Sequence, residues 1–128
     1  MEIIAVDGDR YALKSTAKAI KKAVPDCILS SFGMPGEAIV YAREHRVDVA
    51  FLNIEKEVMG NALILAKNLK EIYGYTNIFF VTGSPEFAKS DGDLFKPVTA
   101  RAVAWAMGRL WWPVMATGET TPSTFGVH

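Results

Sequence analysis

Polar residues that could do chemistry follow four of the apolar segments in this chain. The segments "IIAV", "VAFL", "IFFV" and "LF" are followed by six such residues: Asp7, Asp9, Asn53, Glu55, Thr82 and Lys96. The acids are oxygen ligands suited to a hard cation such as Mg²⁺, and the hydroxyl and ammonium groups would hold an anion beside it. A single polar residue at a strand end is ordinary, but four such endings in this order favour a small polar site.

The elements needed to bring these residues together are a set of alternating strands and helices. Hydrophobic periodicity predicts strands at residues 2–6, 27–32, 47–52, 77–82 and 94–95. Helices are predicted at 10–24, from Pro35 to about 42, at 61–73 and at 99–112, with Thr99 as the cap of the last one. A helix between residues 82 and 94 is expected to be short or missing.

Such alternation predicts right-handed crossovers and a doubly wound, five-stranded parallel sheet flanked by four to five helices. In an open sheet of this kind, ligands gather beyond the carboxyl ends of the strands. The six polar residues are therefore expected at one edge of the sheet.

Composition narrows the function classes. The chain has 128 residues, half of them apolar, which suits a single domain over residues 1–113. Fourteen basic and fourteen acidic side chains cancel, so the positive field needed for direct nucleic acid binding is missing. No apolar run is long enough to span a membrane. Residues 114–128 are rich in Thr, Gly, Ser and Pro, and are expected to form a linker, a disordered tail or the start of a truncated output domain.

The lone Cys27 cannot form an internal disulfide, and the start of the chain has no signal-peptide pattern, so a cytoplasmic location is expected. An enzyme is not expected. Cys27, His45 and His128 lie in an apolar strand, late in a helix and in the tail, so no nucleophile is paired with a base.

The stretches "IIAVDGD", "VDVAFLNIE", "IFFVTG" and "LFKPVT" together resemble the receiver domain of bacterial response regulators over residues 1 to about 112. The resemblance implies a flavodoxin-like fold and a role in two-component signal transduction and phosphorelay. In that family a histidine kinase donates a phosphoryl group to an Asp at the end of the third strand. Two acids after the first strand help to bind Mg²⁺, and a Thr or Ser and a Lys sense the phosphate.

Carried over position by position, the resemblance places Asp7 on the first acid, Gly8 on the second, Asn53 on the phosphoacceptor, Thr82 on the hydroxyl and Lys96 on the lysine. Two positions depart from the family. An amide has no ionised oxygen to attack phosphorus, so Asn53 cannot accept a phosphoryl group. Gly8 removes an acidic metal ligand, for which Asp9 is a partial substitute at best. Mg²⁺ binding is therefore expected to be weak or absent, and no other cofactor is expected.

A third departure concerns the aromatic residue that the family carries shortly before its lysine. The position three residues before Lys96 is Asp93, and the nearest aromatic, Phe95, is expected in the core.

These departures predict an atypical receiver that is independent of phosphorylation and serves as a regulatory interaction or dimerisation module of a transcriptional regulator. An attached output domain or a histidine kinase would be its partner. Two alternatives stay open. Glu55 or Asp9 could serve as phosphoacceptor, with Glu55 pointing to the same side of an extended strand as Asn53. Asn53 could also be an engineered silencing change, although Gly8 and the short fourth helix favour natural degeneration.

The last predicted helix carries two tryptophans away from its apolar face. Trp105 and Trp112 are seven residues apart, opposite the face expected to be buried, which comprises Ala102, Val103, Ala106, Met107 and Leu110. Exposed Trp residues are favoured anchors at protein interfaces. A homodimer or docking contact through this helix is therefore predicted. The competing interpretation is that the helix frays and the rings fold back onto the domain.

Overall fold

The structure is a computed structural model that describes residues 1–55, 59–84, 86 and 93–110. The predicted tail at 114–128 and the second predicted anchor, Trp112, lie outside these residues, as does most of the segment predicted to hold a short fourth helix.

Five parallel strands form one sheet in the order β2-β1-β3-β4-β5. They are β1 (Glu2–Val6), β2 (Ile28–Phe32), β3 (Val49–Asn53), β4 (Asn77–Thr82) and β5 (Leu94–Phe95). The register aligns Val6 with Leu52, Asn53 with Val81, and Thr82 with Phe95. The carboxyl ends of β1, β3, β4 and β5 therefore lie at the same edge, as the sequence predicted.

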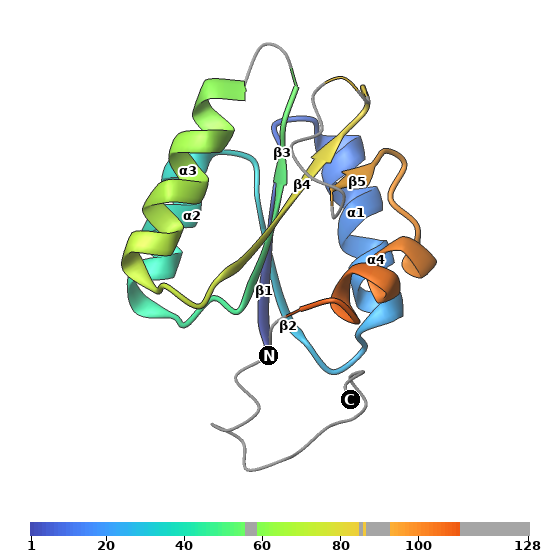
Figure 1. The fold of residues 1–128 in the computed structure, drawn as a ribbon, viewed down its shortest axis with the longest axis horizontal. Helices are drawn as coiled ribbons and strands as arrows, with labels where there is room; N and C mark the ends of the chain where they lie inside the picture. The colour runs from blue at the N-terminus through green and yellow to red at the C-terminus, as the bar shows by residue number, and fades with distance from the viewer. Residues whose placement is uncertain (56–58, 85, 87–92, 111–128) are drawn as a thin grey trace.

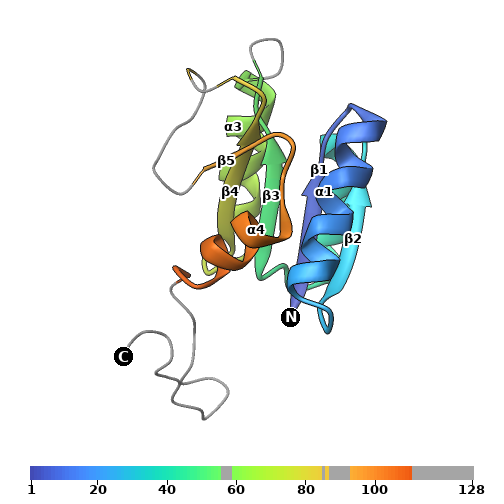
Figure 2. The same ribbon diagram turned by 90° about the vertical axis from the view of Figure 1, so that its right-hand side faces the viewer.

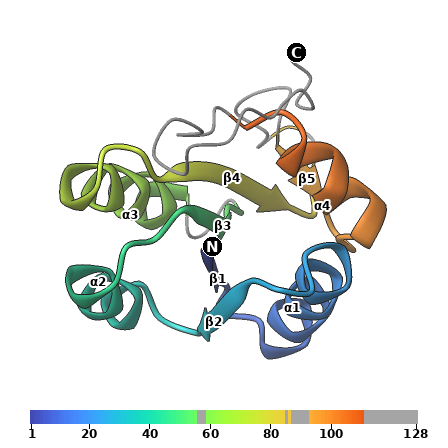
Figure 3. The ribbon, with the colours of Figure 1, turned by 90° about the horizontal axis from the view of Figure 1, so that it is seen from below.

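Four helices cover the sheet within the described residues: α1 (Arg10–Ala23), α2 (Pro35–Glu44), α3 (Met59–Ile72) and α4 (Ala100–Met107). Figures 1 and 3 show α2 and α3 on one face and α1 and α4 on the other. The pair α1 and α4 pack against each other on the face turned to the viewer in Figure 2. The predicted doubly wound parallel fold is confirmed. No described helix combines the length and apolar character needed to cross a bilayer.

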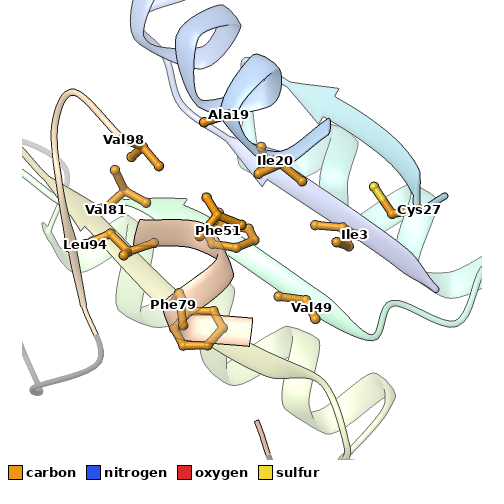
Figure 4. Packing of buried hydrophobic residues seen from close by; sticks show 13 residues of the cluster. Ile3, Ala19, Ile20, Cys27, Val49, Phe51, Phe79, Val81, Leu94 and Val98 are labelled. Atoms are coloured by element: carbon orange, nitrogen blue, oxygen red, sulfur yellow. The ribbon is translucent and has the colours of Figure 1, made fainter. Parts of the chain in front are cut away.

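Alternation along the strands builds two hydrophobic cores. Ile3 and Ala5 of β1 join the cluster under α1 and α4, whereas Ile4 and Val6 join the cluster under α2 and α3. Figure 4 shows the first cluster, in which Phe51 lies beside Phe79 and the Cys27 thiol is buried against neighbouring apolar side chains. Because the central strands β1 and β3 are buried on both faces, their ends are held firmly, which suits them to position a site.

The last helix matches its predicted burial pattern but is shorter than predicted. Val103 and Ala106 are fully buried, and the side chain of Thr99 caps the helix by accepting a hydrogen bond from the Ala102 N–H at 3.1 Å. The helix ends at Met107 rather than 112, and Gly108 follows as its C-cap. Trp105 is 53% exposed, and the guanidinium of Arg109 lies 4.5 Å from its ring centroid.

Phe95 is a correction to the sequence analysis, which expected it in the core. Its side chain is 49% exposed, whereas Leu94 beside it is buried. Successive side chains of a strand point to opposite faces, so a two-residue edge strand can bury one of its side chains while the other faces outward.

Candidate functional site

The polar residues predicted to share one edge of the sheet lie at the ends of four parallel strands. Asp7 follows β1, Asn53 ends β3, Thr82 ends β4 and Lys96 follows β5. Not all of them interact. Glu55 contacts both Thr82 and Lys96, Lys96 also contacts Asp7, and Asn53 lies outside this network.

Lys96 is the centre of the charged cluster. Its Nζ lies 2.8 Å from Asp7 Oδ2 and 3.4 Å from Glu55 Oε2. The Asp7 side chain is almost fully buried, and those of Lys96 and Glu55 are largely covered. Buried carboxylates require a paired charge, because removal from water otherwise disfavours the ionised form. Lys96 supplies that charge to both acids, which leaves the three residues with one excess negative charge.

Glu55 is held at both carboxylate oxygens. Its Oε2 accepts a hydrogen bond from the Gly83 N–H at 2.8 Å, and its Oε1 lies 3.2 Å from the Thr82 hydroxyl, which donates to it. The backbone leading to it is fixed as well, since the Ile54 N–H donates to the Val81 carbonyl and the Ile54 side chain is buried. The reach of the Glu55 side chain could not be predicted from the sequence. The structure shows it joining the end of β3 to β4 and to Lys96.

Thr82 is fully buried, and its hydroxyl takes part in several contacts. It accepts a hydrogen bond from the Ser84 N–H at 3.0 Å and lies within donor distance of both Glu55 Oε1 and the Ser84 carbonyl oxygen, at 3.2 and 3.1 Å. Since a hydroxyl carries one proton, it shares that donor between the two acceptors. Thr82 therefore fixes the turn after β4 and orients Glu55.

Asn53 contributes a buried amide oxygen without a hydrogen-bond partner among the described residues. Leaving such an acceptor unpaired costs about 1–3 kcal/mol. It borders a pocket of about 110 Å³ that is also lined by Asp7, Gly8 and Asn61. The pocket is large enough to admit solvent, and water would supply the donor that the protein does not.

Asp9 has a structural role that the sequence analysis did not assign. Its Oδ1 accepts hydrogen bonds from the N–H groups of Tyr11 and Ala12, at 2.9 and 3.2 Å, so it is the N-cap of α1. Its own N–H donates to Asp7 Oδ1 at 2.9 Å. The signal was present in the sequence, because an Asp directly before a helical segment is a preferred cap.

The donor set does not make a good metal site. Within the described residues, no group of three or more His, Cys, Asp or Glu side chains is arranged to hold a metal ion. The two oxygens of Asp7 already contact Lys96 and the Asp9 N–H, and the Asp9 carboxylate caps a helix. At Gly8, an added Cβ would lie 3.8 Å from the Gly33 carbonyl oxygen, an ordinary contact. The backbone therefore has room for a side chain at position 8, and packing does not require glycine there.

Asp93 stands where the sequence analysis looked for an aromatic residue. It is buried, and its Oδ1 accepts a hydrogen bond from the Phe80 N–H at 3.3 Å. It thus links the start of β5 to the neighbouring strand.

Comparison with known proteins confirms the receiver fold. The chain has a TM-score of 0.67 to a CheY-like response-regulator receiver domain protein from Methanospirillum hungatei, at 21% identity over 83% of this chain and 89% of that one. It has a TM-score of 0.63 to a two-component transcriptional regulator AraC from Clostridium phytofermentans, at 17% identity over 84% and 92% of the two chains.

A third solved structure is a Burkholderia pseudomallei response regulator with a phosphorylated aspartic acid, a calcium ion and citrate. It has a TM-score of 0.66 at 16% identity, over 91% of this chain and 69% of that one. No protein-family model matches the chain, and no curated protein matches it. At these identities the likeness establishes the fold, and function has to be argued from the site.

Proposed function

We propose that the chain is an atypical receiver domain that signals without phosphorylation of an aspartate. The observation that carries the proposal is the amide of Asn53 at the end of β3, where it lines a pocket together with Asp7, whose carboxylate is already paired with Lys96. An acyl phosphate forms when an ionised carboxylate oxygen attacks phosphorus, and an uncharged amide lacks that nucleophile.

The two alternative acceptors, Glu55 and Asp9, are poorly suited to the reaction. Both oxygens of Glu55 accept hydrogen bonds, and one of them also pairs with Lys96. Asp9 is engaged as the cap of α1. A carboxylate that attacks phosphorus would have to give up these bonds, each of which contributes about 1.5–3 kcal/mol when one partner is charged. These contacts favour a structural use of both acids.

A magnesium-assisted transfer is disfavoured by the same contacts. Mg²⁺ prefers near-octahedral oxygen ligands and usually binds through carboxylates. Among the described residues that line the pocket beside Asn53, Asp7 is the one acid, and it is paired with Lys96.

The role that remains is recognition of a partner by the folded domain, as a regulatory interaction or dimerisation module. One similar solved structure is described as a two-component transcriptional regulator, which supports a transcriptional regulator as the parent of this domain. An attached output domain or a histidine kinase is then the expected partner, and the cytoplasm the expected location. The exposed Trp105 on α4 is the candidate contact.

The test is incubation with acetyl phosphate and Mg²⁺ followed by intact-mass measurement. The wild-type chain should gain no phosphoryl group, whereas the double variant Gly8→Asp, Asn53→Asp should gain one. A stoichiometric adduct on the wild-type chain, mapped to Glu55 or Asp9, would overturn the proposal.

The single variant Asn53→Asp addresses the origin of the amide. If Asn53 were an engineered change in an otherwise intact receiver, this variant alone would be phosphorylated as fully as the double variant. We expect much weaker phosphorylation than in the double variant, because position 8 still lacks an acid that could bind Mg²⁺.

A further inference from the structure

Three hydrogen-bond donors from the ends of two neighbouring strands converge on the carboxylate of Glu55. They are the Gly83 N–H at 2.8 Å, the Thr82 hydroxyl at 3.2 Å and the Lys96 ammonium at 3.4 Å. A backbone amide, a hydroxyl and an ammonium group directed at one carboxylate could also bind other oxyanions. Each of these contacts is made to an oxygen atom, whatever molecule carries it.

The donors are positioned by the fold and not by Glu55 itself. Thr82 is fully buried at the end of β4, and the Lys96 N–H donates to the Thr82 carbonyl, which extends the pairing of β4 with β5. The Nζ of Lys96 is also held by Asp7 at 2.8 Å. Preorganised donors of this kind bind an anion without the cost of ordering flexible groups first.

We infer that Glu55 is a tethered ligand, whose carboxylate fills an oxyanion-binding cradle formed by Thr82, Gly83 and Lys96. The inference rests on the proposed function and deepens it. A cradle filled by the chain's own carboxylate holds the ends of β3, β4 and β5 in one arrangement, with no phosphoryl group required. Without Glu55, the three donors would bind inorganic phosphate and related oxyanions. The carboxylate of Glu55 excludes these anions.

Tethering explains why a free anion would not displace Glu55. A ligand linked through a short segment acts at an effective concentration in the millimolar range or above. Here the link is shorter and stiffer than a flexible linker, because Ile54 is buried and its N–H bonds to the Val81 carbonyl. Inorganic phosphate also carries more negative charge than a carboxylate, and the Asp7 carboxylate already lies beside Lys96.

The experiment is a titration with inorganic phosphate, followed by the NMR shift of the Gly83 amide. Removal of the carboxylate in Glu55→Ala should give a saturable shift with an affinity at least about tenfold above that of the wild-type chain, a difference of about 1.4 kcal/mol. Glu37→Ala, which removes an exposed acid at the start of α2, is the matched control and should behave like the wild type.

A second variant tests the cradle itself. Adding Lys96→Met to Glu55→Ala should abolish the phosphate-dependent shift of Gly83. Equal phosphate affinity in the wild type and Glu55→Ala would overturn the inference, and so would a shift that survives the loss of Lys96.

Glu55→Gln guards against a folding defect, because it preserves the shape of the side chain while removing its charge. It should bind phosphate more tightly than the wild type and more weakly than Glu55→Ala. If neither substitution improves phosphate binding in a folded chain, as judged by dispersed amide spectra, the inference fails.

This readout is separate from that of the proposed function. Phosphorylation of the wild type by acetyl phosphate would refute phosphorylation independence, whereas the titration with inorganic phosphate transfers no phosphoryl group and measures only the anion affinity of the cradle. Failure of the titration would leave the mass experiment unchanged.

Discussion

At the scale of single residues, the balance of charge around Lys96 decides which side chains are compatible with position 53. Asp7 and Glu55 share this one ammonium group, and Asn53 lines the same pockets as Asp7 without adding charge. The neutral amide is thus compatible with a cluster that already has one negative charge in excess. A carboxylate at position 53 would line the same pockets as the Asp7 carboxylate with no additional cation, and like charges in a poorly solvated site repel.

The first prediction follows from this balance. Asn53→Asp should lower the free energy of unfolding by about 1–2 kcal/mol at neutral pH without divalent metal, because it adds an uncompensated charge. Millimolar Mg²⁺ should recover much of the loss, since a ligand that binds only the folded state stabilises it. Urea unfolding with and without Mg²⁺ measures both effects. The wild type should show no Mg²⁺ dependence, and a variant that is indifferent to Mg²⁺ would contradict the prediction.

The places of these residues at one edge of the sheet could be predicted from the sequence, but their contacts could not. The positions of Asp7, Asn53, Thr82 and Lys96 follow from where apolar runs stop, because parallel strands bring their carboxyl ends to one edge. The contacts of Glu55 could not be predicted, because they depend on the Gly83 N–H, a backbone group whose direction is set by the turn after β4.

At the scale of elements, α4 is short and depends on its ends. It has eight residues, and the Thr99 side chain supplies a hydrogen bond to its first turn. Its buried residues complete the core over β3 and β4. Short helices are marginal in isolation, so packing and capping together account for its stability.

Thr99→Ala should therefore destabilise the domain by about 1 kcal/mol, the usual effect of losing an N-cap oxygen. Thr99→Ser keeps the hydroxyl and should cost much less. Urea unfolding of both variants measures the difference. Equal destabilisation by Ala and Ser would mean that the threonine methyl group matters, and not the cap.

Tyr41 links α2 to β1 through a hydrogen bond, and its pKa is raised. The Tyr41 hydroxyl donates to Glu2 Oε1 at 2.5 Å, and its ring stacks on His45 with centroids 4.0 Å apart. Burial, and then the hydrogen bond to Glu2, raise the pKa of Tyr41 above its ordinary value of 10.0. The folded state therefore retains the phenol proton more firmly than the unfolded state. This contribution to stability is present below pH 10 and is lost as the pH rises through the raised pKa.

Tyr41→Phe should cost about 1 kcal/mol near neutral pH, where the hydrogen bond to Glu2 is intact. The gap between the two proteins should narrow above about pH 10, because Phe has no proton to lose. Chemical unfolding of both proteins at neutral and alkaline pH measures the gap. A gap that widens with pH would contradict the assigned direction of the pKa shift.

The boundaries of the elements were predictable where turn residues marked them. Three strands, at residues 2–6, 77–82 and 94–95, begin and end where the sequence indicated. The last helix was predicted too long, because its apolar periodicity continues past Gly108 while the backbone ends the helix there. Phe95 was misplaced for a different reason, since exposure depends on which face of an edge strand a neighbouring element covers.

At the scale of the whole molecule, the exposed aromatic surface of α4 suggests self-association. Trp105 is half-exposed, with Arg109 stacked on its ring, and both residue types are enriched at interface anchors. The second predicted anchor, Trp112, lies outside the described residues.

If α4 forms a homodimer contact, Trp105→Ala should weaken dimerisation by about tenfold or more, the effect of losing a central interface anchor. Sedimentation of the full chain over a range of concentrations measures this. Tyr11→Ala, which removes a highly exposed aromatic residue from α1, is the control and should leave association unchanged. Unchanged association in Trp105→Ala would show that this surface does not dimerise.

The burial of Cys27 has a practical consequence. It is the single cysteine of the chain, 3% exposed at the entrance to β2, and packed in the cluster under α1 and α4. A thiol reagent can reach it only when that side of the sheet opens, so its labelling rate reports how often the opening occurs. The native chain thus contains its own probe of local unfolding. Comparing the labelling rate with the rate of global unfolding would show whether the outer strand β2 opens independently of the strand ends that carry the site.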